Sequence, residues 1–263
     1  MRCPDLRKVA EVITVISREE VLPRFKHLSV SDIDTKNSSE DFVTTADTET
    51  EKRLTNELTA LLPGSLVVGE EAAFKDPSVL DYLKDDKPVW VIDPIDGTMN
   101  FAYGRSEIGV VVALVYKGET VAGWLFNPVY QRMIMGEKGC GAWYEDKKLK
   151  VAEVSDLHKM TGVVGRRLAF KDERLPKPVW WGSASFGYML IISGGTHYSA
   201  YRTKIIKPWD HAAGVMLHAE AGGYTSYVDG KSYTPLVGAN HLISAPNKEA
   251  WEYLRANLCA KAD

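Results

Sequence analysis

Cysteine is scarce in this sequence: its 263 residues include only three, Cys3, Cys140 and Cys259. They lie far apart and are odd in number, so their spacing matches neither a metal-binding motif nor a disulfide framework. Sparse, unpaired cysteine is typical of proteins from a reducing compartment. We therefore expect a cytoplasmic protein.

Long hydrophobic runs and an excess of one charge are also absent. No stretch approaches the roughly 20 apolar residues of a membrane-spanning helix, and the charged residues from Asp5 to Glu11 leave no apolar core for a secretory signal. The 32 basic and 35 acidic residues give a net charge of −3, which provides no general attraction to nucleic acid or to an anionic membrane. The sequence therefore predicts neither of these partners.

What is present is an ordinary globular composition. Hydrophobic residues make up 45% of the chain and charged residues 25%, as in typical globular domains. A chain of this length fits one layered unit or two closely packed lobes. Because the pattern of elements changes after Lys150, we expect an N-terminal α+β lobe over 1–150 and a C-terminal α/β lobe over 151–263.

Apolar periodicity and turn signals predict the elements of each lobe. In the N-terminal lobe we expect helices over 6–16 and 44–62, a loop over 29–40, and a mostly antiparallel sheet with strands over 66–69, 89–92, 108–116, 120–126, 131–135 and 141–144. In the C-terminal lobe we expect strands over 163–164, 179–181 and 236–245, helices over 185–192 and 210–221, and a final helix capped by Asn247.

One predicted strand carries the most informative motif. The apolar run from Val89 to Ile92 is typical of a buried strand, and it ends in Asp93-Pro94-Ile95-Asp96-Gly97-Thr98. Two acids crowded at a strand end repel each other unless a cation lies near them. If a helix follows, its first free N–H groups can hold an oxyanion beside that cation. The motif therefore predicts phosphate chemistry, with most of the metal ligands in the N-terminal lobe.

Acidic residues also stand at the ends of three other predicted elements: Asp47, Glu70 with Glu71, and Asp210. Ligands that are all oxygen favour Mg²⁺ or Mn²⁺ over zinc, and acids from separate elements could together hold two or three such ions. Taken singly, Asp47 and Asp210 could each be a helix N-cap, and Glu70-Glu71 a solvated pair. The metal interpretation therefore depends on the combination.

That combination resembles one family. Asp93 to Thr98 with Asn100-Phe101, preceded by Gly69-Glu70-Glu71 and followed by Trp209-Asp210 and Glu220-Ala221-Gly222-Gly223, is similar to the motifs of the inositol monophosphatase family, in the same order, from about Lys36 to Asn247. This resemblance implies a Mg²⁺-dependent, lithium-sensitive phosphatase. It also implies a layered αβαβα sandwich fold of the sugar-phosphatase type, usually assembled as a homodimer.

The resemblance further implies roles for individual positions. Glu70, Asp93 and the Ile95 carbonyl would bind a first metal, and Asp93, Asp96 and Asp210 a second, with a third, weaker ion near Glu70. Thr98, supported by Asp47, would activate the attacking water, since such a pair can orient a water and accept its proton; with Glu70 they form the expected catalytic set.

Other positions would hold the substrate. The resemblance implies that the N–H groups of Gly97 and Thr98 bind the phosphate, and that the turn Gly182-Ser183-Ala184, with Asp96 and Asp210, contacts the rest of the substrate. Lys36 matches a family lysine near the metals, although a solvated loop lysine is an equal alternative.

Two departures from the family pattern concern the substrate. Many inositol phosphatases have a glutamate that binds inositol hydroxyls seven residues before the position of Asp210, where this chain has Thr203, and the segment 165–178 is short for the family. Residues 159–207 contain only two acids, Asp172 and Glu173, against nine basic residues, namely Lys159, Arg166, Arg167, Lys171, Arg174, Lys177, Arg202, Lys204 and Lys207. This stretch could be a solvated or dimer-facing surface, or the rim of a pocket for a second phosphate.

We therefore expect a Mg²⁺-dependent phosphomonoesterase that acts on a small phosphorylated polyol or sugar such as inositol 1-phosphate. One alternative keeps the chemistry and changes the substrate to fructose 1,6-bisphosphate, phosphoadenosine phosphate or histidinol phosphate. Another, from a different class, is a protein with the phosphatase fold that acts as a regulatory binding partner.

Overall fold

The computed structural model describes residues 3–28, 32–35, 42–166, 168–203, 205–236 and 241–260. Its helices are α1 (Leu6–Ile16), α2 (Thr45–Leu61), α3 (Glu70–Lys75), α4 (Thr98–Ala102), α5 (Ala184–Ile192), α6 (Pro208–Glu220) and α7 (Lys248–Asn257). Shorter helical turns are a π-helical turn at Ser17–Val21 and 3₁₀ turns at Pro77–Lys84 and Leu157–Lys159. None of these described helices has the length and apolar character needed to cross a membrane.

The strands form two larger sheets and two small pairs. The strands are β1 (Ile33–Thr35), β2 (Phe42–Thr44), β3 (Leu66–Gly69), β4 (Val89–Asp96), β5 (Gly109–Tyr116), β6 (Glu119–Asn127), β7 (Arg132–Glu137), β8 (Gly141–Tyr144), β9 (Lys147–Lys148), β10 (Gly162–Val164), β11 (Leu168–Phe170), β12 (Tyr198–Arg202), β13 (Tyr224–Tyr227), β14 (His241–Ala245) and β15 (Leu258–Ala260). Over the described ranges, the larger sheets have the orders β3-β4-β5-β6-β7-β8-β9 and β10-β12-β14-β13, and the small pairs are β1-β2 and β11-β15.

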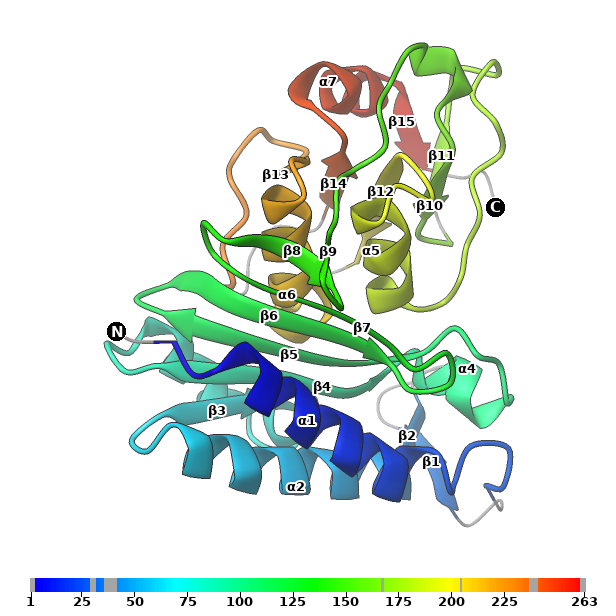
Figure 1. Ribbon diagram of the computed structural model, residues 1–263. Coiled ribbons are helices and arrows are strands. Elements are labelled where there is room, and N and C mark those ends of the chain that lie inside the picture. The colour runs from blue at the N-terminus through cyan, green and yellow to red at the C-terminus, as the bar shows by residue number, and fades with distance from the viewer. Residues whose placement is uncertain are drawn as a thin grey trace.

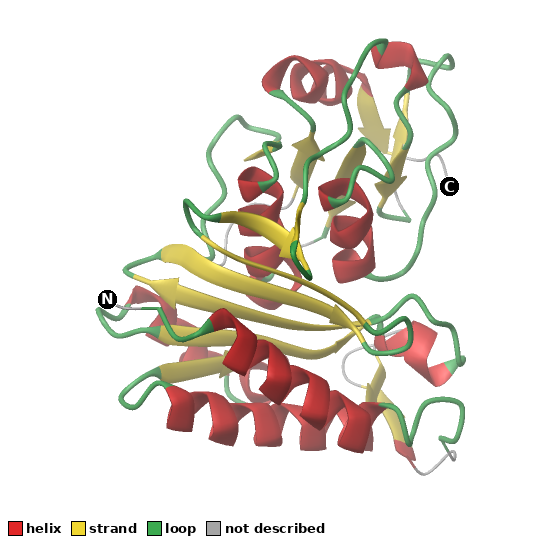
Figure 2. Ribbon diagram, in the orientation of Figure 1, coloured by secondary structure: helices red, strands yellow, loops and turns green. Residues whose placement is uncertain are grey.

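Helical and sheet layers alternate through the molecule (Figures 1 and 2). The helices α1 and α2 cover one face of the sheet β3–β9, and α5 and α6 lie between its other face and the sheet formed by β10, β12, β13 and β14. Helix α7 packs outside that second sheet, against β14. The expected αβαβα sandwich is therefore confirmed.

Strand β4 is buried along its whole length, and its residues from Val89 to Ile92 are all apolar because both faces of its sheet are covered. Trp90 and Ile92 lie in the core under α1 and α2, whereas Val89 and Val91 lie in the core against α5 and α6. The strand pairs in parallel with β3 and antiparallel with β5, and the pairings from β5 to β9 are all antiparallel. The prediction of a mostly antiparallel sheet is confirmed.

Several sequence predictions correspond to observed elements, and two were wrong. The helices over 6–16 and 44–62, the hairpin around Lys117-Gly118, and the Asn247 cap of α7 are all present. The expected loop over 29–40 contains β1, and the expected strand over 179–181 is only an isolated bridge from Val179 to Val163. The chain turns soon after this bridge, at Gly182, whose φ is 73°.

The boundary that we placed near residue 150 stays a prediction. Strand β9 ends at Lys148 and β10 begins at Gly162, so the two larger sheets use different halves of the chain. The helices α5 and α6 nevertheless come from the second half and pack on the first sheet through residues such as Tyr188 and Leu217. Because of this packing, the first half lies directly against the start of α6, where Asp210 stands.

Candidate functional site

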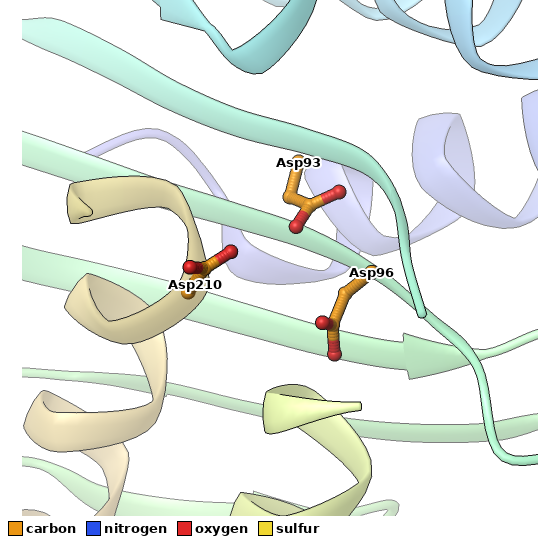
Figure 3. Close-up of side chains that lie close together, drawn as sticks. All are labelled: Asp93, Asp96 and Asp210. Carbon is orange, nitrogen blue, oxygen red and sulfur yellow. The ribbon is translucent and has the colours of Figure 1, made fainter. Parts of the chain in front are cut away.

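Three carboxylates come together where β4 ends. Asp93 and Asp96 belong to β4 and Asp210 to the first turn of α6, and one oxygen of each lies within 4.8 Å of the others (Figure 3). Asp93 is 1% exposed and Asp96 8% exposed. Since Asp210 is more than a hundred residues from the other two, packing of α6 on the sheet creates the cluster.

Pro94 explains how both acids of β4 come to face Asp210. Side chains three apart on a regular strand point to opposite faces of the sheet. Pro94 has no N–H to donate, and the pairing of β4 with β5 is irregular between Asp93 and Asp96. This irregularity lets the two carboxylates turn to the same side (Figure 3).

Gly97 makes the turn from β4 into α4. Its φ is 85°, in the left-handed region, and a Cβ there would lie 3.1 Å from the Glu107 carbonyl oxygen and 3.1 Å from the Ser183 Cβ. Both the backbone conformation and the lack of space therefore require glycine. Thr98, which follows at the start of α4, is carried to the edge of the carboxylate cluster.

The turn before α5 holds Asp96 in place. Its carboxylate accepts hydrogen bonds from the Ser183 hydroxyl at 2.6 Å, the Ser185 N–H at 2.6 Å and the Ala184 N–H at 3.2 Å. Two residues that we expected to contact substrate, Ser183 and Ala184, thus donate to Asp96. Sequence reasoning missed Ser185, although the Ser-Ala-Ser sequence at a helix start was a visible signal.

Thr98 and Asp47 are brought together as the resemblance implied. The Thr98 hydroxyl lies 3.4 Å from Asp47 Oδ1 and donates to the Ile95 carbonyl at 2.9 Å. The other Asp47 oxygen accepts from the Thr44 N–H at 2.8 Å and the Thr44 hydroxyl at 2.6 Å, which makes Asp47 part of the capping box of α2. Asp47 therefore has a structural partner and also faces the site.

Glu70 stands at the start of α3, outside the close cluster. Its charge nevertheless contributes to the raised pKa of Asp93 and of Asp210. A second acid, Glu51, lies behind it and escaped sequence reasoning. Glu51 is 7% exposed and accepts hydrogen bonds from the backbone N–H groups of Glu71 at 2.8 Å and Ala72 at 2.9 Å. A signal existed, because Glu51 falls on the same face of α2 as the buried Leu54 and Leu58.

Burial and mutual repulsion disfavour the charged forms of these acids. Burial is the largest cause that raises the pKa of Asp93, followed by the charges of Glu70 and Asp96. Burial, then Glu70 and Asp96, raises the pKa of Asp210 to about 8. Burial likewise raises the pKa of Asp47 to about 7 and that of Asp96 above its ordinary value.

The donor set fits a hard divalent cation. Asp93 Oδ1 is buried, and no hydrogen-bond donor reaches it from the part of the chain that the structure describes. A buried acceptor of this kind is costly unless a donor or a cation satisfies it. Because the converging side chains supply only oxygen atoms, the cluster suits Mg²⁺ or Mn²⁺ better than zinc. The assignments of individual ligands stay predictions.

A cavity of about 290 Å³ opens beside the cluster and is called here the catalytic pocket. It is lined by Asp96, Val163, Val164, Gly165, Arg166, Trp180, Trp181, Gly182, Ser183, Ala184, Tyr201, Arg202, Thr203, Asp210 and His211. Thr203 thus lies where we expected the substrate-reading position, and its hydroxyl donates to the Ile205 carbonyl at 2.7 Å. Of the basic stretch, Arg166 and Arg202 reach this pocket, whereas Arg167 and Lys204 lie outside the described residues. Lys36, the lysine that the resemblance placed near the metals, also lies outside them.

Comparison with known proteins gives a consistent result. A model of the inositol monophosphatase family matches residues 5–262. The chain is 30% identical over 209 residues to a Thermotoga maritima protein named fructose-1,6-bisphosphatase/inositol-1-monophosphatase. This alignment covers 77% of each sequence. It is 26% identical to the Nus factor SuhB of Vibrio cholerae, over 85% of this chain and 86% of that protein. The solved T. maritima IMPase superposes with a TM-score of 0.73 at 25% identity, over 92% of this chain and 89% of the other.

Proposed function

Since this chain belongs to the inositol monophosphatase family and is a phosphoric monoester hydrolase, we propose that it is a Mg²⁺-dependent phosphatase of a small phosphorylated polyol or sugar. The observation that carries the metal dependence is the convergence of Asp93, Asp96 and Asp210 within 4.8 Å, with Asp96 and Asp210 lining the catalytic pocket. Acids so close together at a pocket are best explained by a cation and a phosphate that bind there.

The proposal includes two or three divalent ions per site. Glu70, Asp93, the Ile95 carbonyl, Asp96 and Asp210 would hold them, and Mn²⁺ would substitute for Mg²⁺. Bound divalent ions supply Lewis acidity and offset the negative charge of the transferring phosphoryl group.

The chain's own groups would orient the reactants. Thr98 and Asp47, 3.4 Å apart, would position the attacking water and accept its proton. The N–H groups of Gly97 and Thr98 would bind phosphate oxygens. Gly182, Ser183 and Ala184 would line the leaving group beside Asp96 and Asp210, while the Ser183 hydroxyl and the Ala184 N–H of this turn donate to Asp96.

Phosphate release by an Asp93→Asn variant tests the proposal. We expect kcat/KM for inositol 1-phosphate to fall at least 100-fold, because loss of a bridging ligand removes several kcal/mol of transition-state stabilisation. The matched control is Asp81→Asn, an exposed acid on a 3₁₀ turn, and EDTA should abolish the wild-type activity. Equal rates for Asp93→Asn and the wild type would refute the metal role.

A different phosphate ester is the second candidate substrate. It is favoured by Thr203, which supplies no carboxylate to bind inositol hydroxyls, and by Arg166 and Arg202 on the pocket wall. The name of the T. maritima relative includes fructose-1,6-bisphosphatase. Rates on inositol 1-phosphate, fructose 1,6-bisphosphate, phosphoadenosine phosphate and histidinol phosphate decide between them. A wide preference for inositol 1-phosphate would contradict the significance given to Thr203.

A regulatory role is the candidate from another class, and the similarity to a protein named Nus factor SuhB favours it. The presence of Asp47, Glu70, Asp93, Thr98 and Asp210 favours catalysis over a pure scaffold. A pull-down with Asp93→Asn separates the two roles, because a binding function should survive the substitution.

The remaining properties that the family suggests are a homodimer, a cytoplasmic location and inhibition by lithium. Light scattering at several protein concentrations tests the first, cell fractionation the second, and a lithium titration of phosphate release the third. A monomer at every concentration, a membrane or secreted fraction, or activity indifferent to lithium would contradict the corresponding expectation.

A further inference from the structure

A second cavity, of about 620 Å³, adjoins the catalytic pocket. The two share the lining residues Val164, Gly165, Arg166 and Trp180, so they have one wall in common. We call it the side cavity. Its other lining residues are Leu168, Ala169, Phe170, Asp172, Glu173, Leu175, Pro176, Lys177 and Pro178. Most of its lining residues thus come from the segment 165–178, which is short for the family.

The walls of the side cavity are tied to the rest of the fold. Strand β11, which forms one wall, pairs with β15 from the end of the chain. In the loop that follows, Arg174 makes a two-point ion pair with Asp172, with N–O distances of 2.9 and 2.8 Å, and Asp172 also accepts from the Tyr253 hydroxyl. These contacts anchor the loop to α7, so the cavity has supports on both sides.

The shared wall and the rest of the side cavity differ in chemistry. In the shared wall the Arg166 guanidinium lies over the Trp180 ring, 5.9 Å from its centroid. The side cavity is also lined by the apolar residues Leu168, Phe170, Leu175, Pro176 and Pro178. The charged residues of the side cavity, Asp172, Glu173 and Lys177, follow on the loop.

The combination of a guanidinium, an indole and apolar side chains favours some phosphate esters over others. A phosphate at Asp96 and Asp210 leaves the rest of the ligand to extend past Trp180, because the catalytic pocket of about 290 Å³ holds little more than a phosphate and a small polyol. In the side cavity a sugar hydroxyl would meet apolar side chains, whereas a flat or apolar group would gain contact with them and with the indole.

We propose that the side cavity binds the non-reacting end of the substrate, and that the preferred substrate is a phosphomonoester whose alcohol carries an aromatic or other flat apolar group. The inference rests on the proposed phosphatase function and, among its candidate substrates, favours esters with an aromatic group over a polyol or sugar phosphate. The observation that carries it is the wall that the two cavities share, in which Arg166 lies over Trp180.

A filled cavity tests the proposal. Ala169 lines the side cavity but not the catalytic pocket, so Ala169→Trp should block the side cavity and leave the catalytic pocket intact. The probes are 2-(2-naphthyl)ethyl phosphate and glycerol 1-phosphate, both esters of primary alcohols. We expect the wild type to favour the naphthyl ester at least tenfold in kcat/KM. Ala169→Trp should lower kcat/KM for that ester at least tenfold, mainly through KM, and change the value for glycerol 1-phosphate less than twofold.

The control introduces the same side chain elsewhere. Tyr82 lies on the 3₁₀ turn Pro77–Lys84, is 42% exposed and lines neither cavity. Tyr82→Trp should therefore leave kcat/KM unchanged for both substrates. Circular dichroism checks the fold of each variant. If Ala169→Trp does not fold, Pro176→Trp, at an exposed residue that lines the side cavity but not the catalytic pocket, replaces it and should selectively weaken catalysis on the naphthyl ester. A wild type that prefers glycerol 1-phosphate, or a filled cavity that affects both substrates equally, overturns the proposal.

A binding measurement separates this inference from the catalytic one. The phosphonate analogue of the naphthyl ester cannot be hydrolysed, so its Kd by titration calorimetry reports binding without turnover, and the change in that Kd caused by Ala169→Trp reports on the side cavity. If neither ester releases phosphate with Mg²⁺, the proposed function fails. The side cavity is then judged by whether Ala169→Trp raises that Kd at least tenfold, and an unchanged Kd would refute it.

Discussion

The carboxylate of Glu51 accepts a hydrogen bond from the backbone N–H of Glu71 at 2.8 Å and a second from Ala72 at 2.9 Å. A buried acid on α2 thereby fixes the first turn of α3, which carries Glu70 toward the carboxylate cluster. The fit is close, because a Cβ on Gly69 would lie 2.3 Å from the Glu51 carboxyl carbon. Glu51 therefore acts as a positioning residue for Glu70.

Glu51→Gln should weaken metal binding without unfolding the protein. Glutamine keeps the size of the side chain but presents one acceptor oxygen and one NH₂ group to two N–H donors, so one hydrogen bond is lost and α3 shifts. We expect the Kd for Mg²⁺, measured by titration calorimetry, to rise at least tenfold, with a loss of stability of about 1–3 kcal/mol. Glu49→Gln, an exposed acid on the same helix, is the control. An unchanged Mg²⁺ Kd would show that α3 does not depend on Glu51.

Gly97→Ala should destabilise the protein through both backbone strain and contact. Alanine at φ of 85° costs about 1 kcal/mol, and its Cβ would press on Glu107 and Ser183 at 3.1 Å. Gly118→Ala separates these causes, because Gly118 has φ of 76° but no atom within 4 Å of an added Cβ. Urea unfolding should give a loss near 1 kcal/mol for Gly118→Ala and a clearly larger loss for Gly97→Ala. Equal losses would mean that the contact with the Ser183 turn costs nothing.

Ser183→Ala should impair both α5 and Asp96. The Ser183 hydroxyl donates to Asp96 at 2.6 Å and accepts from the Phe186 N–H at 3.2 Å as the N-cap of α5. We expect a loss of stability of about 1 kcal/mol and a raised half-saturating Mg²⁺ concentration in phosphate release, because Asp96 is less well oriented. Ser193→Ala, at the other end of α5, should lower stability only. If both serine variants kept the wild-type Mg²⁺ dependence, the orienting role would be refuted.

The parts of the site that the sequence predicted are those with a local cause. Pro94 and Gly97 act on their own backbone, so the strand end at Asp93 to Thr98 could be recognised from six consecutive residues. Asp210 could be placed at a helix start because Pro208 precedes it at the first helical turn. That these acids meet was inferred from the resemblance to a family, since local pattern does not fix how α6 packs on β4.

The parts that escaped prediction depend on contacts between distant residues. Glu51 is recognisable only as an acid on the buried face of α2, and its partners lie twenty and twenty-one residues away. The pairing of β11 with β15 joins residues about ninety positions apart, and it forms a wall of the side cavity. A three-residue strand carries too short an alternation to be read from sequence, so the cavity became visible only in the fold.

His218 should make the stability of the protein fall as the pH falls. Its ring is fully buried on α6, with Nδ1 2.9 Å from the Thr225 hydroxyl, and burial lowers its pKa to about 3. Between the ordinary pKa of 6.5 and about 3, the unfolded chain binds a proton that the folded chain refuses. Stability therefore decreases over that window by up to about 1.4 kcal/mol per pH unit from this residue.

The comparison with His218→Gln isolates this contribution. Other buried groups titrate in the same range, but they are common to both proteins, so the difference between the two pH slopes belongs to His218. Urea unfolding at pH 6.5, 5.5 and 4.5 should give a flatter slope for His218→Gln than for the wild type, whatever the variant's absolute stability. Identical slopes for His218→Gln and the wild type would mean that His218 takes up its proton in the folded state, and that the ring is not held neutral by burial.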